Sequence, residues 1–151
     1  MKRLSSVLTT VVTVLLVACG GSDGPTDPGG NNGDNGDGDT RQILTNPSFG
    51  QNITEIFVRR GCTGGGCHGE ATQNNLDLRS NAAFANLVNV AAFGAPGETR
   101  VIPGDAENSY VVKKLEGRQT AGARMPLGGT PLDNIDLTNI RNWIDQGAAN
   151  N

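Results

Sequence analysis

An all-α domain of about four short helices, joined by loops rich in glycine and proline, is the fold class that the sequence predicts. Apolar residues recur at helical spacing in four separate segments, almost no stretch alternates between apolar and polar residues, and glycine or proline stands near most segment ends. The chain has 151 residues, 22 of them glycine, which is enough for one domain of ordinary size. We therefore expect one helical domain over residues 43–151.

The first two expected helices stand on either side of a cysteine-containing segment. The first spans residues 52–60 and ends at Gly61, because glycine commonly terminates helices. The helical spacing of Phe49, which precedes it, and of Ile53, Ile56 and Phe57 predicts this helix. The second spans residues 82–90, with Ser80 or Asn81 as its N-cap. Its apolar positions are Phe84, Leu87 and Val88.

The last two expected helices lie in the C-terminal third of the chain. Asp105 is suited to cap the third helix, which runs to residue 116 and ends at Gly117. The fourth helix is the most regular, with Asp133 as its N-cap and Gly147 as its C-terminal stop. Its inward positions are Ile135, Ile140, Trp143 and Ile144.

Residues 1–18 have the pattern of a targeting signal. Two basic residues precede an apolar run over residues 7–17, which is shorter than the ~20 residues that span a bilayer. The step Leu16-Val17-Ala18-Cys19 resembles the lipobox of bacterial lipoproteins. This resemblance implies cleavage before Cys19 and lipidation of Cys19, and hence a membrane anchor. An uncleaved anchor is the alternative, and either interpretation places the domain outside the cytoplasm.

Residues 19–42 form a polar linker between the signal and the domain. From residue 20 to residue 40 there are eight glycines and five aspartates but no large apolar side chain, so this stretch is expected to be disordered. Its Asp-Gly steps lack the register and the closing glutamate of a calcium loop. By resemblance to lipoproteins, Gly20 after the lipidated cysteine favours the outer membrane of the cell envelope, with the domain facing the periplasm or the exterior.

Charge and residue types exclude two classes of function. The formal net charge is −3, and the sequence has no basic patch of the kind that nucleic-acid binding requires. The chain contains one histidine and no arrangement of serine, histidine and aspartate or of paired carboxylates that predicts an active site. We therefore expect neither a nucleic-acid partner nor an enzyme.

The candidate site is the segment RGCTGGGCHG at residues 60–69, which holds both cysteines of the expected domain and the histidine. Two cysteines outside the cytoplasm form a disulfide unless they are otherwise occupied. Zinc is an alternative, although Cys62, Cys67 and His68 would need a fourth ligand such as Glu70. Covalent haem attachment is the third, since a cysteine followed by a histidine supplies a thiol for a vinyl group and an imidazole for iron.

A wider pattern of segments bears on this choice. It comprises a helix that ends at the first cysteine, then CHG at 67–69, LDL at 76–78, VIPGD at 101–105, SY at 109–110, RMP at 124–126 and IRNWIDQGA at 140–148. Together these segments resemble the small haem-binding c-type cytochrome domains of bacterial envelope proteins. The resemblance implies a cytochrome c-like fold over the domain, with Trp143 packed where the first and last helices cross.

The resemblance also implies one covalently attached haem c and the residues that hold it. Residues matching Cys62 and Cys67 form the thioethers in that family, and the residue matching His68 is the proximal iron ligand. The methionine of the Arg-Met-Pro step, here Met125, is the distal ligand. His/Met ligation suits electron transfer, so the resemblance implies an envelope electron-transfer protein whose partners are other envelope redox proteins.

The spacing of the cysteines departs from the commonest pattern of the family. Four residues separate Cys62 from Cys67, where c-type attachment usually has two. Three of the four are glycines, so a wider loop can fold over a porphyrin edge at low steric cost. The alternative function is a lipid-tethered binding or structural module without haem, in which these glycines form the turn of a Cys62–Cys67 disulfide.

Met125 is the only methionine beyond the signal segment. It stands in a glycine-rich loop beside Pro126 and not on an apolar helix face, where a methionine that fills a gap in the core is expected. The chain has no second histidine, so the iron cannot have two histidine ligands. A haem sensor, in which Met125 leaves the iron, is a further alternative. Arg100 and Arg124 are either partners of the haem propionates or solvated surface residues.

Overall fold

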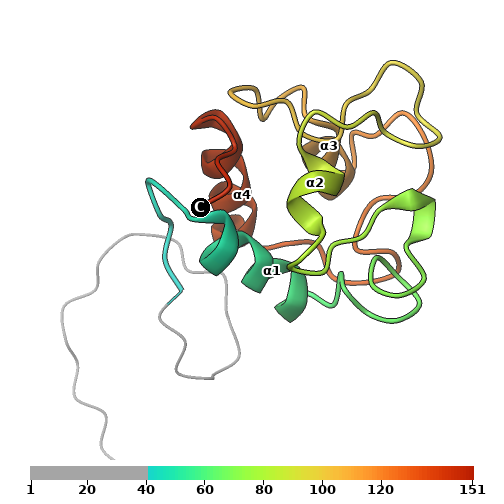
Figure 1. Cartoon of the computed structure of the whole chain (residues 1–151), viewed down its shortest axis with the longest axis horizontal. Coiled ribbons are helices and arrows are strands. Elements are labelled where there is room, and N and C mark those ends of the chain that lie inside the picture. The colour runs from blue at the N-terminus through green and yellow to red at the C-terminus, as the bar shows by residue number, and fades with distance from the viewer. Residues whose placement is uncertain (1–40) are drawn as a thin grey trace, which may run out of the picture. The chain divides into compact units, whose positions relative to one another are not determined.

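The computed structural model describes residues 41–151 (Figure 1). The predicted signal segment, Cys19 and nearly all of the predicted linker lie outside the described residues. Helices are the main regular structure of the described range, and its extended segments make only isolated bridges. The prediction of a mostly α-helical domain is therefore confirmed. None of the helices in residues 41–151 is both long enough and apolar enough to cross a membrane.

The first helical segment begins earlier than predicted. A π-helical turn, η1 (Phe49–Ile53), continues directly into helix α1 (Thr54–Arg59). The side chain of Ser48 accepts a hydrogen bond from a backbone N–H of the first turn, which makes Ser48 the N-cap. The expected start at residue 52 is thus wrong. The expected end is confirmed, because Gly61 has a φ of +71° just after the helix.

Helix α2 (Ala83–Leu87) is shorter than the predicted 82–90. Val88 leaves the helical conformation and forms an isolated parallel bridge with Val101, which is distant in the sequence. The predicted caps are also wrong, since the N-cap position is Ala82 and no side chain caps the helix. A short 3-10 turn, η2 (Gln73–Asn75), precedes α2 and follows the cysteine loop.

Helix α3 (Tyr110–Glu116) has Ser109 and not Asp105 at its N-cap position. Asp105 instead closes the preceding turn, where its carboxylate accepts hydrogen bonds from the backbone and side-chain nitrogens of Asn108. The predicted role of Asp105 as the N-cap is therefore wrong. Aspartate is common in turns for the same reason that it caps helices, since its carboxylate accepts hydrogen bonds from nearby backbone N–H groups. Gly117 ends the helix in the left-handed conformation, as predicted.

Helix α4 (Asn134–Asp145) agrees with the prediction at both ends. The side chain of Asp133 caps it by accepting a hydrogen bond from the backbone N–H of Asp136, and Gly147 follows its last turn with a φ of +101°. Trp143 on α4 is 2 % exposed, its ring centroid lies 5.0 Å from that of Phe49, and its indole N–H donates to the carbonyl of Ala149. Trp143 is thus a core residue at the contact between the first and last helical segments.

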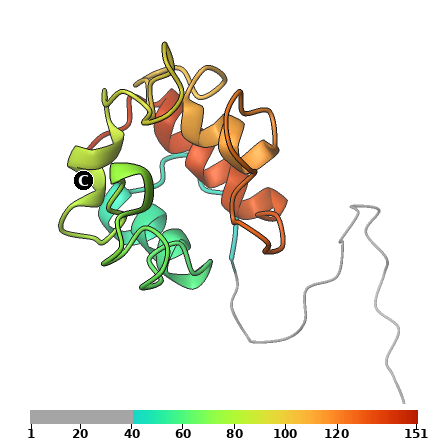
Figure 2. The same cartoon turned by 90° about the vertical axis from the view of Figure 1, so that its right-hand side faces the viewer.

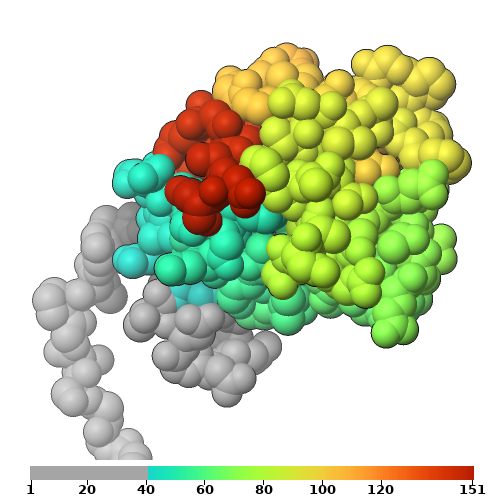
Figure 3. Space-filling view, viewed as in Figure 1, coloured from blue at the N-terminus to red at the C-terminus, as the bar shows by residue number. Residues whose placement is uncertain are grey.

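The C-terminal residue lies against the start of η1, as Figures 1 and 3 show. The backbone oxygen of Asn151 accepts hydrogen bonds from the N–H of Gly50 and the hydroxyl of Ser48, and its side-chain oxygen accepts one from the N–H of Phe49. These contacts occupy donors that the helix start would otherwise leave unpaired. They join the two ends of the described chain.

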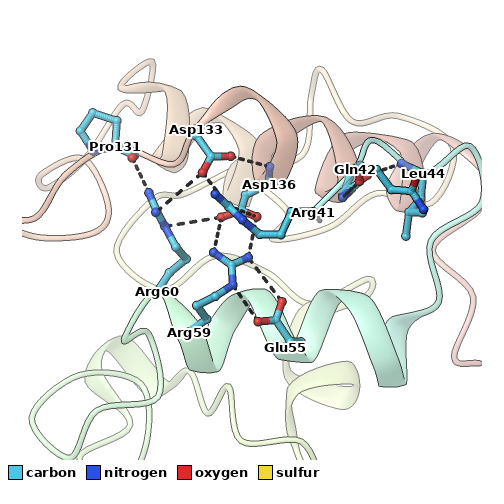
Figure 4. A network of polar contacts seen from close by, with 10 residues as sticks. Arg41, Gln42, Leu44, Glu55, Arg59, Arg60, Pro131, Asp133 and Asp136 are labelled. Atoms are coloured by element: carbon cyan, nitrogen blue, oxygen red, sulfur yellow. Dashed lines mark hydrogen bonds and ion pairs between the residues drawn. The ribbon is translucent and has the colours of Figure 1, made fainter. Parts of the chain in front are cut away.

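A buried carboxylate ties α1 to α4 (Figure 4). The side chain of Asp136 is 1 % exposed, and its two oxygens accept hydrogen bonds of 2.6 and 3.1 Å from Arg59. Arg41 donates a third at 3.3 Å, and Arg60 forms an ion pair at 3.6 Å. The hydrogen bond from Arg59 to Asp136 is the main cause of a raised pKa of Arg59. This network sets the position of α1, and α1 leads directly to the cysteine loop.

Candidate functional site

The cysteine loop at residues 60–69 is closed by backbone hydrogen bonds. The N–H of Cys62 donates to the carbonyl of Phe57 at the end of α1, and the N–H of His68 donates to the carbonyl of Cys62 at 3.0 Å. Within the loop, the N–H of Cys67 donates to the carbonyl of Gly64. The structure therefore brings the first cysteine and the histidine together at the base of the loop, as their closeness in the sequence suggests.

The two cysteines of the loop have different surroundings. Cys62 is partly buried and packs against the hydrophobic core, whereas Cys67 is exposed. Burial raises the pKa of the Cys62 thiol. Both cysteines are free thiols, so the alternative Cys62–Cys67 disulfide is not formed in this structure. Residues 41–151 contain no cluster of three or more histidine, cysteine or acidic side chains that could hold a metal ion.

Gly69, directly after the histidine, is buried where a side chain has no room. A Cβ atom on Gly69 would lie 2.2 Å from the carbonyl oxygen of Thr63 and 3.1 Å from that of Gly64. Both obstacles are backbone atoms, so the loop itself would have to move to admit a methyl group. The glycine that follows the histidine is thus required for the close approach of the two sides of the loop.

Gly69→Ala is expected to lower the free energy of unfolding of the chain by about 1–3 kcal/mol, the usual cost of forcing extra volume into a packed site. Gly66→Ala is the matched control, because nothing lies within 4 Å of a Cβ atom there. Urea unfolding of both variants checks this expectation. Equal stability of the two would contradict the steric role of Gly69.

The imidazole of His68 is oriented by a backbone carbonyl. Its Nδ1 lies 3.0 Å from the carbonyl oxygen of Gln73, and since a carbonyl only accepts, Nδ1 carries the proton. Nε2 then has the free lone pair that a metal ion requires. Burial lowers the pKa of His68, and hydrogen bonding with the backbone at Leu76 and Gln73 opposes that shift only in part. The ring is therefore biased toward its neutral form, which is the form that binds metals.

The haem-free domain is expected to lose stability as the pH falls below about 6.5, the ordinary pKa of histidine. Because the pKa of His68 is lower in the folded state than in the unfolded chain, the unfolded chain binds more protons between the two values. The free energy of unfolding therefore falls as the pH is lowered through this window. Urea unfolding at a series of pH values checks this. In His68→Gln the dependence of the free energy of unfolding on pH should vanish in this window. An unchanged dependence would show that another group causes it.

Met125 lies in the connection that runs from the end of α3 to the start of α4. Figure 2 shows this connection as an orange segment between the two helices. Its side chain is partly buried and packs against the hydrophobic core. Its N–H donates to the carbonyl of Lys114 on α3, and its peptide bond with Pro126 is cis. The charge of Lys114 also contributes to lowering the pKa of His68. Lys114 thus contacts the methionine loop and lies close enough to the histidine to affect it electrostatically.

Two side chains of α3 hold the loop that precedes Met125. The Lys114 ammonium donates to the carbonyls of Ala121 and Ala123 at 2.9 and 2.7 Å. The Tyr110 hydroxyl donates to the carbonyl of Ala121 and accepts a hydrogen bond from its N–H. Neither residue was predicted from the sequence to be part of the site. The Ser-Tyr step of the family pattern was the one signal that could have pointed to Tyr110.

The two arginines considered for propionate binding differ in environment. Arg100 is 7 % exposed, and its guanidinium donates to backbone carbonyls of Asn74, Asn75 and Asn86. It is therefore not a solvated surface residue, and burial lowers its pKa. Arg124 is exposed, and its side chain lies against Gly117 at the end of α3.

The chain was compared with models of protein families, with curated proteins and with solved structures. None of the three comparisons finds a match. The likeness to c-type cytochrome domains thus stays a prediction from the sequence motifs.

The side chains of the site fit a covalently attached haem by their chemistry. His68 has an unprotonated Nε2, two free thiols stand in the same loop, and Met125 offers a partly buried thioether. Nitrogen and thioether ligands together suit haem iron. Arg100 adds a buried positive charge whose guanidinium donates to three backbone carbonyls, and a buried guanidinium suits a group that carries carboxylates.

Proposed function

We propose that residues 43–151 form a c-type cytochrome domain that transfers electrons in the cell envelope. The observation that carries this proposal is the state of the cysteine loop, in which Nδ1 of His68 donates to a carbonyl, so that Nε2 is unprotonated, and two unpaired thiols lie in the same loop. Haem iron supplies reversible one-electron chemistry when it is bound. Cys62 and Cys67 would hold the group covalently, and His68 and Met125 would be the axial ligands.

The contacts of the site would orient the two iron ligands. The carbonyl of Gln73 keeps the proton of His68 on Nδ1, so that Nε2 is presented as a ligand. Lys114 and Tyr110 hold the loop that presents the sulfur of Met125. His68 and Met125 would both hold the iron and leave no position for a substrate, so the domain would act as an electron carrier and not as an enzyme.

The proposed cellular setting follows from the N-terminal pattern. Lipidation at Cys19 would tether the domain to a membrane of the envelope, and the polar linker would let it reach redox proteins nearby. The outer membrane is favoured by the glycine that follows the cysteine. Metabolic labelling with a fatty-acid analogue tests this part, and Cys19→Ala should abolish the label and release the protein from the membrane fraction.

A reduced-minus-oxidised visible spectrum with a pyridine haemochrome assay tests the central proposal. The chain should be produced in a host that has the c-type maturation machinery. We expect a c-type α band that survives extraction with acidified acetone, and an altered spectrum in Met125→Ala because the sixth ligand is lost. A colourless protein without free thiols in the domain would contradict electron transfer and support the disulfide-closed module instead.

A further inference from the structure

The turn that follows His68 is clamped by a buried arginine. One terminal nitrogen of Arg100, Nη2, donates to the carbonyls of Asn74 and Asn75, both at 3.0 Å, and the other, Nη1, donates to the carbonyl of Asn86 on α2 at 2.7 Å. The guanidinium fork thus joins η2 to α2 through backbone oxygens alone. Since a planar fork offers several donors in fixed directions, it holds the turn in one place.

The clamped turn has a backbone conformation that needs outside support. Thr72, Asn74 and Asn75 all have positive φ, at +40°, +57° and +55°. Asparagine tolerates this region, but a β-branched threonine rarely adopts it. Backbone of this kind persists only when the surrounding structure holds it, and the two hydrogen bonds from Arg100 supply such a hold.

The same turn carries the acceptor that orients the histidine ring. Gln73 precedes Asn74 directly, and its carbonyl oxygen lies 3.0 Å from Nδ1 of His68. A rotation of the peptide units at residues 73–75 would carry this oxygen away from the ring. The direction of the imidazole therefore depends on the conformation of the turn.

Arg100 is itself a fixed anchor. Its N–H donates to the carbonyl of Val90 at 2.8 Å, and its carbonyl accepts from the N–H of Val111 on α3 at 3.0 Å. Two other segments, at Val90 and Val111, thus hold the backbone of the residue whose side chain contacts the turn. Displacement of the turn would thus have to break contacts with a side chain whose backbone is fixed by two hydrogen bonds.

We infer that Arg100 is a positioning residue for His68, which acts by holding the turn at residues 72–75 so that the Gln73 carbonyl accepts the Nδ1 proton and Nε2 keeps its direction. This inference deepens the proposed function and rests on it only for the statement that His68 binds iron. The geometry of the ring and the turn belongs to the chain itself.

The test compares Arg100→Lys with Arg118→Lys. Lysine keeps the charge and the aliphatic stem at residue 100, but it lacks the planar guanidinium fork that donates to the three carbonyls. Arg118 is an exposed arginine that pairs with Glu107 and Glu116, so the same substitution there is the matched control. Arg100→Gln, whose side chain is shorter and lacks the guanidinium fork, is the second variant should Arg100→Lys fail to fold.

The measurement is made on the Nδ1 proton of His68 by nitrogen-15 NMR, which is unambiguous because the chain has one histidine. In the reduced, haem-loaded protein, we expect exchange of this proton with solvent to be faster by about tenfold in Arg100→Lys, the scale of one lost hydrogen bond, and unchanged in Arg118→Lys. A change of reduction potential should accompany it. A folded Arg100→Lys protein with unchanged exchange would overturn the inference, even if its thermal stability were lower.

A failure of the proposed function gives a different result. If the chain takes up no haem, the haem-free protein is measured at a pH well above the pKa of histidine, where the ring is neutral. The wild-type ring should then be protonated mainly on Nδ1, and Arg100→Lys should move the population toward the Nε2-protonated tautomer. An unchanged tautomer ratio there would refute the positioning role of Arg100 independently of haem.

Discussion

Asp136→Asn is expected to lower the free energy of unfolding by about 3 kcal/mol, which is the lower part of the range for breaking a buried ion pair. The change leaves the amide in place of a carboxylate that is 1 % exposed and that receives hydrogen bonds from Arg59 and Arg41 and an ion pair from Arg60. The three arginines would lose their common counter-ion while remaining in a confined space. Their partial contact with water keeps the expected cost at the lower end.

Glu55→Gln provides the matched control for this prediction. Glu55 pairs with the same Arg59, yet its side chain is 51 % exposed, and exposed pairs contribute about 0–1 kcal/mol. Chemical unfolding of the two variants under the same conditions makes the comparison. A loss for Asp136→Asn that is no larger than the loss for Glu55→Gln would show that the buried network contributes little to stability.

Replacement of both Cys62 and Cys67 by serine is expected to abolish covalent attachment of haem. On the proposed function the two thiols are the only covalent anchors, so acidified acetone should then remove all haem from the protein. Each single substitution should leave one thioether, and the vinyl group that stays unsaturated should move the α band of the pyridine haemochrome to longer wavelength.

The single variants decide how the wide spacing of the cysteines is used. Cys62 is partly buried against the core and Cys67 is exposed, so both should be compared with Cys19→Ser, which leaves the loop intact. If Cys62→Ser has the same haemochrome spectrum as the wild-type loop, Cys67 alone carries the haem and the first cysteine has another role. Haem that resists extraction in the double variant would contradict thioether attachment.

Helix ends that depend on local chemistry could be predicted from the sequence. Asp133 caps α4 through its own side chain, and Gly117 ends α3 in the left-handed conformation, so both signals lie within a few residues of the helix end. The early end of α2 could not be predicted in this way. It depends on a bridge between Val88 and Val101, and a hydrophobic period within one segment carries no information about such a distant partner.

The start of α3 shows the same limit. Asp105 has the side chain of an N-cap, but the hydroxyl of Ser109 donates to its carbonyl and accepts from the N–H of Ile102. The adjacent N–H of Gly104 donates to the carbonyl of Ile144 on α4. These contacts hold the chain in a turn until Tyr110, and the one with α4 arises only in the folded domain.

The candidate site was predictable where it is local and not where it is assembled from distant segments. Cys62, Cys67 and His68 are neighbours in the sequence, and the structure keeps them in one loop. The acceptor for the imidazole is the backbone oxygen of Gln73. Every residue has such an oxygen, so the residue type at position 73 does not predict this contact. Arg100, which holds the turn that contains Gln73, lies in a segment beyond α2. The sequence shows that it is a cation but does not show that its partners are the carbonyls of Asn74 and Asn75.

The hydrogen bond that closes the cysteine loop has a consequence for how such sites are recognised. The N–H of His68 donates to the carbonyl of Cys62, so the two ends of the loop are held together whatever lies between them. The intervening Gly65 and Gly66 face open space, where added residues would extend outward without displacing either end. Residues inserted between Gly65 and Gly66 can therefore lengthen the interval between the cysteines while the histidine stays in register with the first thiol, and a motif search with one fixed interval would overlook domains built in this way.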